Sequence, residues 1–107
     1  MSLLTKQQQT KLQKQYSKGN DFNQKVVAKV FNPSGAGTWY LINQDPDDTD
    51  YLWCVADLGM GHEMGSVLLS ELESVRGRFG LPLERDKWFD EMTVKELYKK
   101  LDEGKHV

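Results

Sequence analysis

The 107-residue sequence contains a single cysteine, Cys54, so it cannot form an internal disulfide, which fits a reducing compartment. No apolar run approaches the ~20 residues that cross a bilayer. The first residues show neither the apolar segment nor the cleavage site of a secretory signal. These absences argue against a secreted disulfide-rich domain and a membrane protein, and we expect a cytoplasmic protein without membrane contacts.

One sign of charge is also missing from the middle of the chain. Residues 30–75 contain eight acidic side chains and no Lys or Arg, whereas residues 1–29 carry six lysines against one aspartate. Such segregation creates a local negative field even at a net charge of −2. Two interpretations stay open: the basic N-terminal part packs against the acidic middle, or the middle binds a protein partner with a basic surface. The expected acidic surface comprises Asp45, Asp47, Asp48 and Asp50.

The same lack of basic side chains argues against nucleic acid as a partner. Aromatic residues such as Trp39 and Trp53 on the expected strands are suited to stacking on bases. Affinity for a phosphate backbone, however, depends on Lys and Arg. We therefore do not expect this sheet to bind nucleic acid.

The length and composition indicate one globular domain over residues 1–107, since 38 % of the residues are hydrophobic and 28 % charged. β-Branched and aromatic residues predict strands at 25–31, 38–44, 51–58 and 64–69. Their short connections favour an antiparallel meander of about four strands. Residues 80–83 are expected to be an edge segment, because Pro82 cannot donate to a central ladder.

Three capping boxes predict three helices. The first helix begins at Thr5 and ends near Gly19; its thin apolar stripe leads us to expect that the basic residues 1–20 are loosely held and mobile. The second begins at Ser70 and ends at Gly77, and the third begins at Thr93. The fold class is therefore predicted as α+β, with N-terminal, short central and C-terminal helices. The apolar stripe expected to pack the third helix on the sheet is Val94, Leu97, Tyr98 and Leu101.

Most candidate motifs for metal binding, phosphate binding or catalysis lack the residue spacing that this chemistry requires. The aspartates at 45–50 lack the Gly and Glu positions of an EF-hand, and the glycines at 59–61 precede a strand rather than the helix of a phosphate loop. Asp57, His62 and Glu63 have no metal-site spacing, and Cys54 lies in the middle of an apolar strand. We therefore expect no metal, cofactor or catalytic residue, and favour a protein that is not an enzyme.

Carboxylates and arginines near the 59–61 turn form the remaining candidate site. The structural interpretation is that Arg76 or Arg85 binds a carboxylate of the acidic middle, such as Asp57. The functional alternative is a cleft of a small enzyme or ligand-binding protein, in which carboxylates surround a ligand opposite an arginine. That cleft would be formed by Asp57, Glu71, Arg76, Glu84 and Arg85. The full set of candidate ligand or partner contacts is Asp57, Glu63, Glu71, Arg76, Glu84, Arg85 and Asp86.

A combination of motifs over residues 38–86 resembles a known family. The motifs are Thr38-Trp39, Asp45-Pro46, Asp57-Leu58-Gly59-Met60-Gly61, the run over residues 69–77 and the segment over residues 80–86. The family they resemble is the bacterial, plasmid- and phage-associated group catalogued as domain of unknown function 2958, and the similarity extends over nearly the whole chain. The resemblance implies mobile-element or accessory biology without an established activity. It also makes His62 a poor essential ligand, because the family has a proline- or glutamate-containing variant there.

Together these observations predict a small non-enzymatic interaction module of mobile-element or bacterial origin. Its acidic central surface is expected to contact a protein. The alternative is the carboxylate and arginine cleft of an enzyme or ligand-binding protein.

Overall fold

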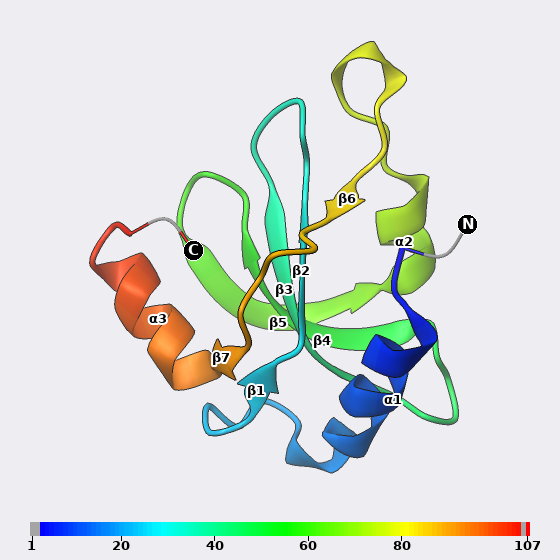
Figure 1. Ribbon diagram of the computed structural model, residues 1–107, viewed down its shortest axis with the longest axis vertical. Coiled ribbons are helices and arrows are strands. Elements are labelled where there is room, and N and C mark those ends of the chain that lie inside the picture. Colours follow the sequence, from blue (N-terminus) through cyan, green and yellow to red (C-terminus); the bar gives the residue numbers. More distant parts are fainter. Residues whose placement is uncertain (1–2, 106) are drawn as a thin grey trace.

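The computed structural model describes residues 3–105 and residue 107 (Figure 1). Its centre is an antiparallel sheet of five strands in the order β5-β4-β3-β2-β6. The strands are β2 (Ala28–Phe31), β3 (Thr38–Gln44), β4 (Tyr51–Asp57), β5 (His62–Leu68) and β6 (Glu84–Arg85). The α-helices are α1 (Lys6–Lys14), α2 (Leu69–Ser74) and α3 (Val94–Asp102), so the α+β class is confirmed.

The predicted meander is confirmed, but the strand expected over 25–31 is divided in two. β1 (Lys25–Val26) pairs with β7 (Met92–Thr93) in a separate two-stranded sheet, and β2 starts at Ala28. Val26 belongs to the apolar cluster on the α3 side, whereas Val27 and Ala28 belong to the cluster on the opposite side. Regular alternation along one strand over 25–31 would place Val26, Ala28 and Val30 on one face of the sheet. Instead, the chain crosses between the two faces at Val27, so Val26 lies on the face opposite to Ala28 and Val30.

The sheet also has one strand more than the predicted meander. β6 pairs antiparallel with β2 and forms the edge of the sheet. It begins just after the predicted edge segment 80–83, in which Pro82 makes only an isolated bridge to Arg76. The edge strand thus lies just after the predicted segment, and residues 80–83 themselves do not join the sheet.

Two apolar clusters cover the two faces of the sheet. One includes Leu12 of α1, Leu41 of β3 and Leu72 of α2. The other includes Val94 and Leu97 of α3, with Tyr98 and Leu101 packed against it as predicted. Figure 1 shows α3 on one side of the molecule and α1 and α2 on the other. The central strands are thereby buried on both faces.

Both terminal helices start with the predicted capping boxes. Thr5 Oγ1 accepts the amide of Gln8, and Thr93 Oγ1 accepts the amide of Glu96, each at 3.1 Å. The side chains of Gln8 and Glu96 accept the Thr5 and Thr93 amides in return. Gly104, with φ 73°, follows the end of α3 in a left-handed conformation that glycine adopts without strain. Among the described residues, no helix has the length and apolar character that crossing a bilayer requires.

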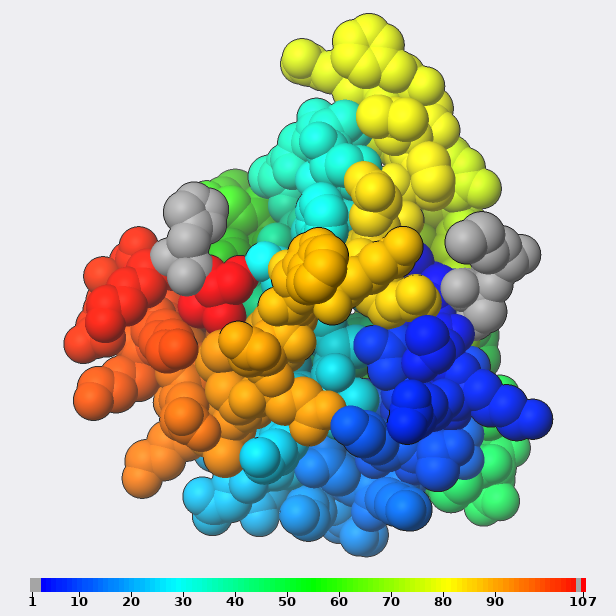
Figure 2. All heavy atoms as spheres, in the orientation of Figure 1, coloured from blue at the N-terminus to red at the C-terminus, as the bar shows by residue number. Residues whose placement is uncertain are grey.

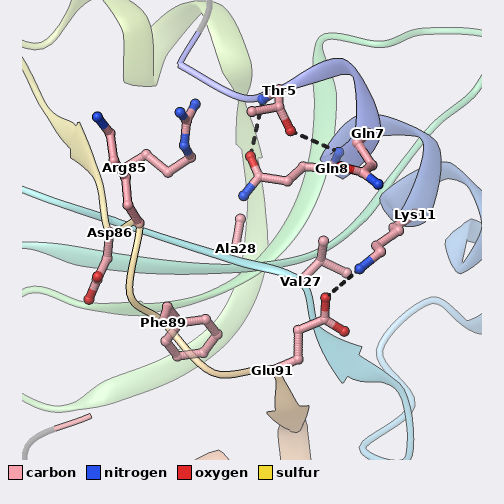
Figure 3. Close-up of a pocket in the computed structure, with 11 residues that line it drawn as sticks. Thr5, Gln7, Gln8, Lys11, Val27, Ala28, Arg85, Asp86, Phe89 and Glu91 are labelled. Atoms are coloured by element: carbon pink, nitrogen blue, oxygen red, sulfur yellow. Dashed lines mark hydrogen bonds and ion pairs between the residues drawn. The ribbon is translucent and has the colours of Figure 1, made fainter.

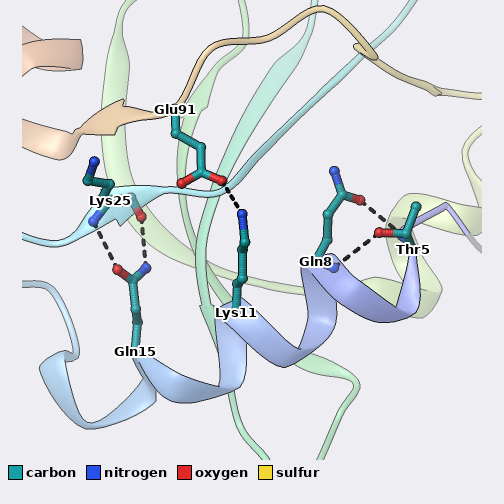
Figure 4. Close-up of polar contacts among 6 residues, drawn as sticks. All are labelled: Thr5, Gln8, Lys11, Gln15, Lys25 and Glu91. Carbon is teal, nitrogen blue, oxygen red and sulfur yellow. Dashed lines mark hydrogen bonds and ion pairs between the residues drawn. The ribbon is translucent and has the colours of Figure 1, made fainter.

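α1 has anchors that its thin apolar stripe does not reveal. Leu4 and Leu12 are buried in the main cluster. Gln15 Nε2 also donates to the main-chain oxygens of Lys25 and Ile42, at 2.8 and 2.7 Å; Figure 4 shows the contact with Lys25. Hydrogen bonds from side-chain amides thus help to hold α1 on the sheet although its apolar stripe is narrow. The mobility of residues 1–20 stays a prediction.

α2 starts earlier than predicted and has a different cap. The main-chain oxygen of Asp50 accepts the Leu69 amide at 2.8 Å. The Asp50 carboxylate accepts the amide and the hydroxyl of Ser70, at 2.7 and 2.8 Å. Glu71 adds a bond to the Leu68 amide at 3.2 Å. The prediction that Ser70 caps this helix is wrong. The helix start is capped by Asp50, which lies in the turn between β3 and β4 and is brought to α2 by the fold.

Replacing Asp50 with Ala should lower the free energy of unfolding by about 1 kcal/mol, the typical loss when a helix N-cap is removed. Urea denaturation followed by circular dichroism measures the change. Asp47→Ala is the matched control, because Asp47 is exposed in the same turn and its carboxylate accepts no hydrogen bond from the described residues. Equal stabilities of the two variants would contradict the capping role of Asp50.

Cys54 should be unreactive in the folded protein. It is 2 % exposed, and burial raises the pKa of its thiol to about 12, so the reactive thiolate is absent at pH 8. We expect a chromogenic disulfide reagent at pH 8 to label Cys54 rapidly in urea but not under native conditions. Rapid labelling of the native protein would show that the thiol is accessible and would contradict this assignment.

Candidate functional site

Arg85 lies where three surface clefts meet. It belongs to the edge strand β6, and its Nη1 donates to the main-chain oxygen of Leu3 at 2.9 Å. The clefts have volumes of about 360, 470 and 400 Å³, and Arg85 and Lys87 line all three. The guanidinium therefore fastens the N-terminal segment to the sheet edge and forms part of each cleft wall.

The first cleft lies between α1 and the segment 85–91 (Figure 3). Its floor includes the buried residues Val27 and Ala28. Lys11 Nζ and Glu91 Oε2 lie 2.8 Å apart and join the two walls (Figures 3 and 4). Because both side chains are substantially exposed, this ion pair contributes at most about 1 kcal/mol. The cleft is a polar groove over a small apolar floor.

The second cleft lies between α2 and the chain after Pro82. Leu72 and Leu83, both buried, are part of its lining. The Glu73 carboxylate accepts the Leu3 amide at 2.9 Å. Arg76 Nη1 donates to two main-chain oxygens at the end of α2, at 2.9 and 2.8 Å. This cleft combines an apolar floor with acidic and basic groups at its rim.

A projecting loop over residues 77–81, here called the finger, rises beside the second cleft (Figures 1 and 2). Its base is closed by a hydrogen bond from the Gly77 amide to the Leu81 oxygen at 2.7 Å. Phe79 has φ 62° and is 91 % exposed. A left-handed backbone costs a residue other than glycine roughly 1–2 kcal/mol. The finger therefore exposes the Phe79 ring to solvent, and the backbone at Phe79 is strained.

Gly77 fixes the base of the finger. The sequence predicted it as the end of the central helix, but α2 ends at Ser74. A Cβ at Gly77 would lie 2.3 Å from Ser34 Oγ and 2.8 Å from Asn32 Oδ1, so only glycine permits this close contact with the β2–β3 turn. The finger therefore rises from a tightly packed base.

A second exposed aromatic side chain, Trp88, borders the third cleft. It is 91 % exposed and lines this cleft together with Lys29 and Phe31. Its amide donates to Asp86 Oδ1 at 2.9 Å, which fixes the backbone there. Tryptophan normally buries most of its surface, and an exposed one is typical of contact surfaces.

A fourth hollow, of about 320 Å³, lies on the α3 side of the sheet. Lys29, Tyr40 and Asp57 line it from three adjacent strands. Lys29 Nζ lies 3.5 Å from Asp86 Oδ2. Burial, followed by the charges of Asp57 and Asp86, raises the pKa of Tyr40 to about 12. The Tyr40 hydroxyl is therefore protonated at neutral pH and available as a hydrogen-bond donor.

The structure divides the residues of the predicted carboxylate and arginine cleft. Arg76, Glu84 and Arg85 line the second cleft together. Asp57 instead lines the hollow on the α3 side, and Glu71 caps α2. Three of the five residues are thus brought together and two are placed elsewhere.

The carboxylate of Asp57 is used locally. Its Oδ1 accepts the Gly59 amide at 3.0 Å, and it takes part in none of the ion pairs among the described residues. We expected Asp57 to bind an arginine, but its carboxylate instead accepts a hydrogen bond from a backbone amide of its own turn. Glu63 pairs in register with Ala56, one residue before Asp57, so it points to the opposite face of the sheet.

The predicted acidic surface is largely a hydrogen-bonded turn. Asp45 Oδ1 accepts the Asp47 amide at 2.8 Å, and Asp48 Oδ1 accepts the Asp50 amide at 3.2 Å. Asp50 also caps α2. These bonds are typical of aspartate in tight turns, and they leave Asp47 as the side chain without such a role within the described part of the chain.

Within residues 3–105 and 107, no group of three or more His, Cys, Asp or Glu side chains is placed to hold a metal ion. His62, considered with Asp57 and Glu63 as a ligand type, instead joins β5 to α3. Its Nε2 lies 2.8 Å from Asp102 Oδ1, and its ring packs edge-on against Tyr98 with centroids 5.0 Å apart. This contact has an evident structural role.

Sequence patterns do not single out Lys29, Tyr40, Phe79 or Trp88. The exposure of Phe79 has one local signal, because it lies between Gly77 and Gly80 in a segment of turn composition. Lys29 and Tyr40 become neighbours only through the pairing of β2 with β3. That register depends on tertiary structure and has no short-range motif.

Comparison with known proteins identifies the family. The family model described as "Protein of unknown function (DUF2958)" matches residues 3–104. No curated protein and no solved structure matches the chain. The family match covers nearly the whole sequence, including the finger and the residues that line the clefts around Arg85. The chain therefore belongs to the DUF2958 family of proteins of unknown function.

Proposed function

We propose that this protein is a non-enzymatic interaction module that binds a protein partner through the finger, Trp88 and the clefts around Arg85. The observation that carries the proposal is Phe79, which is 91 % exposed at the tip of the finger in a left-handed conformation. Exposure of the ring and strain in the backbone both oppose stability in the free protein. The hydrogen bond that closes the base of the finger constrains the backbone around Phe79, so less backbone freedom is lost on binding.

The chemistry of this surface suits a protein partner that is acidic and apolar. Trp and Arg are enriched among the residues that dominate binding energies, and exposed aromatic side chains anchor in pockets of the partner. Basic side chains outnumber acidic ones around the finger and the second cleft, so an acidic rim on the partner would be complementary. The basic residues are Arg76, Arg78, Arg85 and Lys87, and the acidic ones are Glu73 and Glu84.

The acidic turn supports a contact surface less well. Asp45, Asp48 and Asp50 already accept hydrogen bonds within the chain, so a partner would compete with the fold for them. A partner with a basic surface at this turn stays a prediction. Bacterial hosts of mobile elements, which the family resemblance implies, are the source in which we propose to look for either partner.

Truncating Phe79 and Trp88 together to Ala should abolish partner capture. Loss of such anchors typically weakens binding by 2 kcal/mol or more, about 30-fold per residue. The measurement is an affinity pull-down with the tagged full chain from nuclease-treated bacterial lysate, with captured proteins quantified by mass spectrometry. Urea denaturation of each variant checks the fold.

The matched control is Asp47→Lys, an exposed change at the acidic turn. We expect it to retain the partners that the Phe79 and Trp88 variant loses. The opposite pattern would assign the contact to the acidic turn. Identical capture by the wild type and the Phe79 and Trp88 variant would contradict the proposed surface.

A further inference from the structure

Two arginines line the second cleft from its two walls, and neither guanidinium is neutralised by a carboxylate. Arg76 follows α2, and Arg85 belongs to β6. Each uses Nη1 to bind the backbone: Arg76 donates to the main-chain oxygens of Glu73 and Val75, and Arg85 donates to that of Leu3. Within residues 3–105 and 107, neither arginine takes part in an ion pair. Hydrogen bonds to the backbone therefore restrain both side chains, while their charge stays available to a ligand.

The carboxylates of the same cleft do not cancel this charge. Glu73 Oε2 is already engaged, since it accepts the Leu3 amide at 2.9 Å. Glu84 is exposed and forms no ion pair with the rest of the described chain. Lys87 also lines the cleft, so its three cations outnumber its two carboxylates. An anionic group that enters the cleft is therefore attracted.

The floor between the two arginines is apolar. Leu72 is 2 % exposed and Leu83 5 % exposed, and Leu3 and Pro82 line the cleft beside them. The cleft volume of about 470 Å³ is comparable to that of one helical turn, which is about 10 Å wide and about 5.4 Å long. The cleft thus has room for a segment of a few residues that carries both an apolar and an anionic group.

We propose that the second cleft binds a short segment of the protein partner in which a leucine-sized apolar side chain lies next to an aspartate or glutamate. The apolar side chain covers Leu72 and Leu83, and the carboxylate accepts hydrogen bonds from Arg76 and Arg85. Arginine suits this role because its planar group can bind both oxygens of a carboxylate. The inference rests on the proposed function and adds which side chains the partner carries.

The test uses the full chain labelled with ¹⁵N and followed by NMR, with acetyl-Ala-Leu-Glu-Ala-amide as the probe. Both ends of this peptide are blocked, so the glutamate carries its only charge. We expect saturable shifts concentrated at the amides of Leu72, Leu83 and Arg85. Replacing the glutamate of the peptide with Gln, or its leucine with Ser, should weaken binding about ten-fold, because each change removes one of the two contacts.

Arg76→Glu tests the charge in both directions. It should weaken binding of the Leu-Glu peptide about ten-fold and strengthen binding of acetyl-Ala-Leu-Lys-Ala-amide. Lys14→Glu is the matched control, because it makes the same change of charge at an exposed position that lines none of the four clefts. It should leave binding of both peptides unchanged. The amide spectrum checks that each variant is folded, and Arg76→Gln, which should also weaken binding of the Leu-Glu peptide, replaces the Glu variant if that one is not.

Absence of saturable shifts, equal binding of the Gln peptide, or unchanged binding after the Arg76 substitution would overturn the proposal. Equal shifts with inorganic phosphate would also overturn it, since the cleft would then bind anions in general. Shifts that grow with protein concentration alone would assign the cleft to a second copy of the chain instead. Partner capture through Phe79 and Trp88 is measured separately. Loss of peptide binding with intact capture would therefore contradict this inference alone, and the reverse result would contradict only the proposed function.

Discussion

The end of β3 buries two side-chain amides, and their need for partners determines where the N-terminal part of the chain lies. Asn43 and Gln44 are fully buried. A buried amide without a partner costs about 1–3 kcal/mol. Gln13 Nε2 donates to Gln44 Oε1, and Asn43 Nδ2 donates to Gln24 Oε1, both at 2.9 Å. The chain from α1 to Gln24 is therefore held against this strand, and α1 in that position covers one apolar cluster and forms a wall of the first cleft.

The parts of the fold with local signals were predictable from the sequence. Capping boxes located α1 and α3, and β-branched residues with short connections located the meander. The pairings of β1 with β7 and of β6 with β2 join residues more than 50 positions apart, so no local pattern encodes them. The break at Val27 follows from the same pairings, because β1 and β2 belong to different sheets. The α2 cap was missed because Asp50 is separated in sequence from the helix that it caps.

The candidate site was predictable only where charged residues share one segment. The segment Glu84-Arg85-Asp86 remains together at the edge of the sheet and borders the clefts. Asp57 and Glu71 were grouped with it because free carboxylates were expected to seek arginines. Both carboxylates instead accept hydrogen bonds from nearby backbone amides, those of Gly59 and Leu68. These bonds are local, so they require no distant segment to be brought close. The exposure of Trp88 could not be inferred, since aromatic side chains are usually buried and composition does not report the exceptions. The exposure of Phe79 had only the weak local signal of the neighbouring glycines.

The tie between Leu3 and the edge of the sheet also constrains the order of folding. Leu3 contacts Glu73 and Arg85, which follow it by 70 and 82 positions, whereas Gln13 meets Gln44 only 31 positions later. A chain emerging from the ribosome can therefore dock α1 on the meander before Arg85 has been synthesised. In refolding, the entropy of closing the longer loops acts in the same direction. We infer that the contact of Arg85 with Leu3 forms after α1 has docked on the meander, so the clefts around Arg85 are completed later than the contact between α1 and β3.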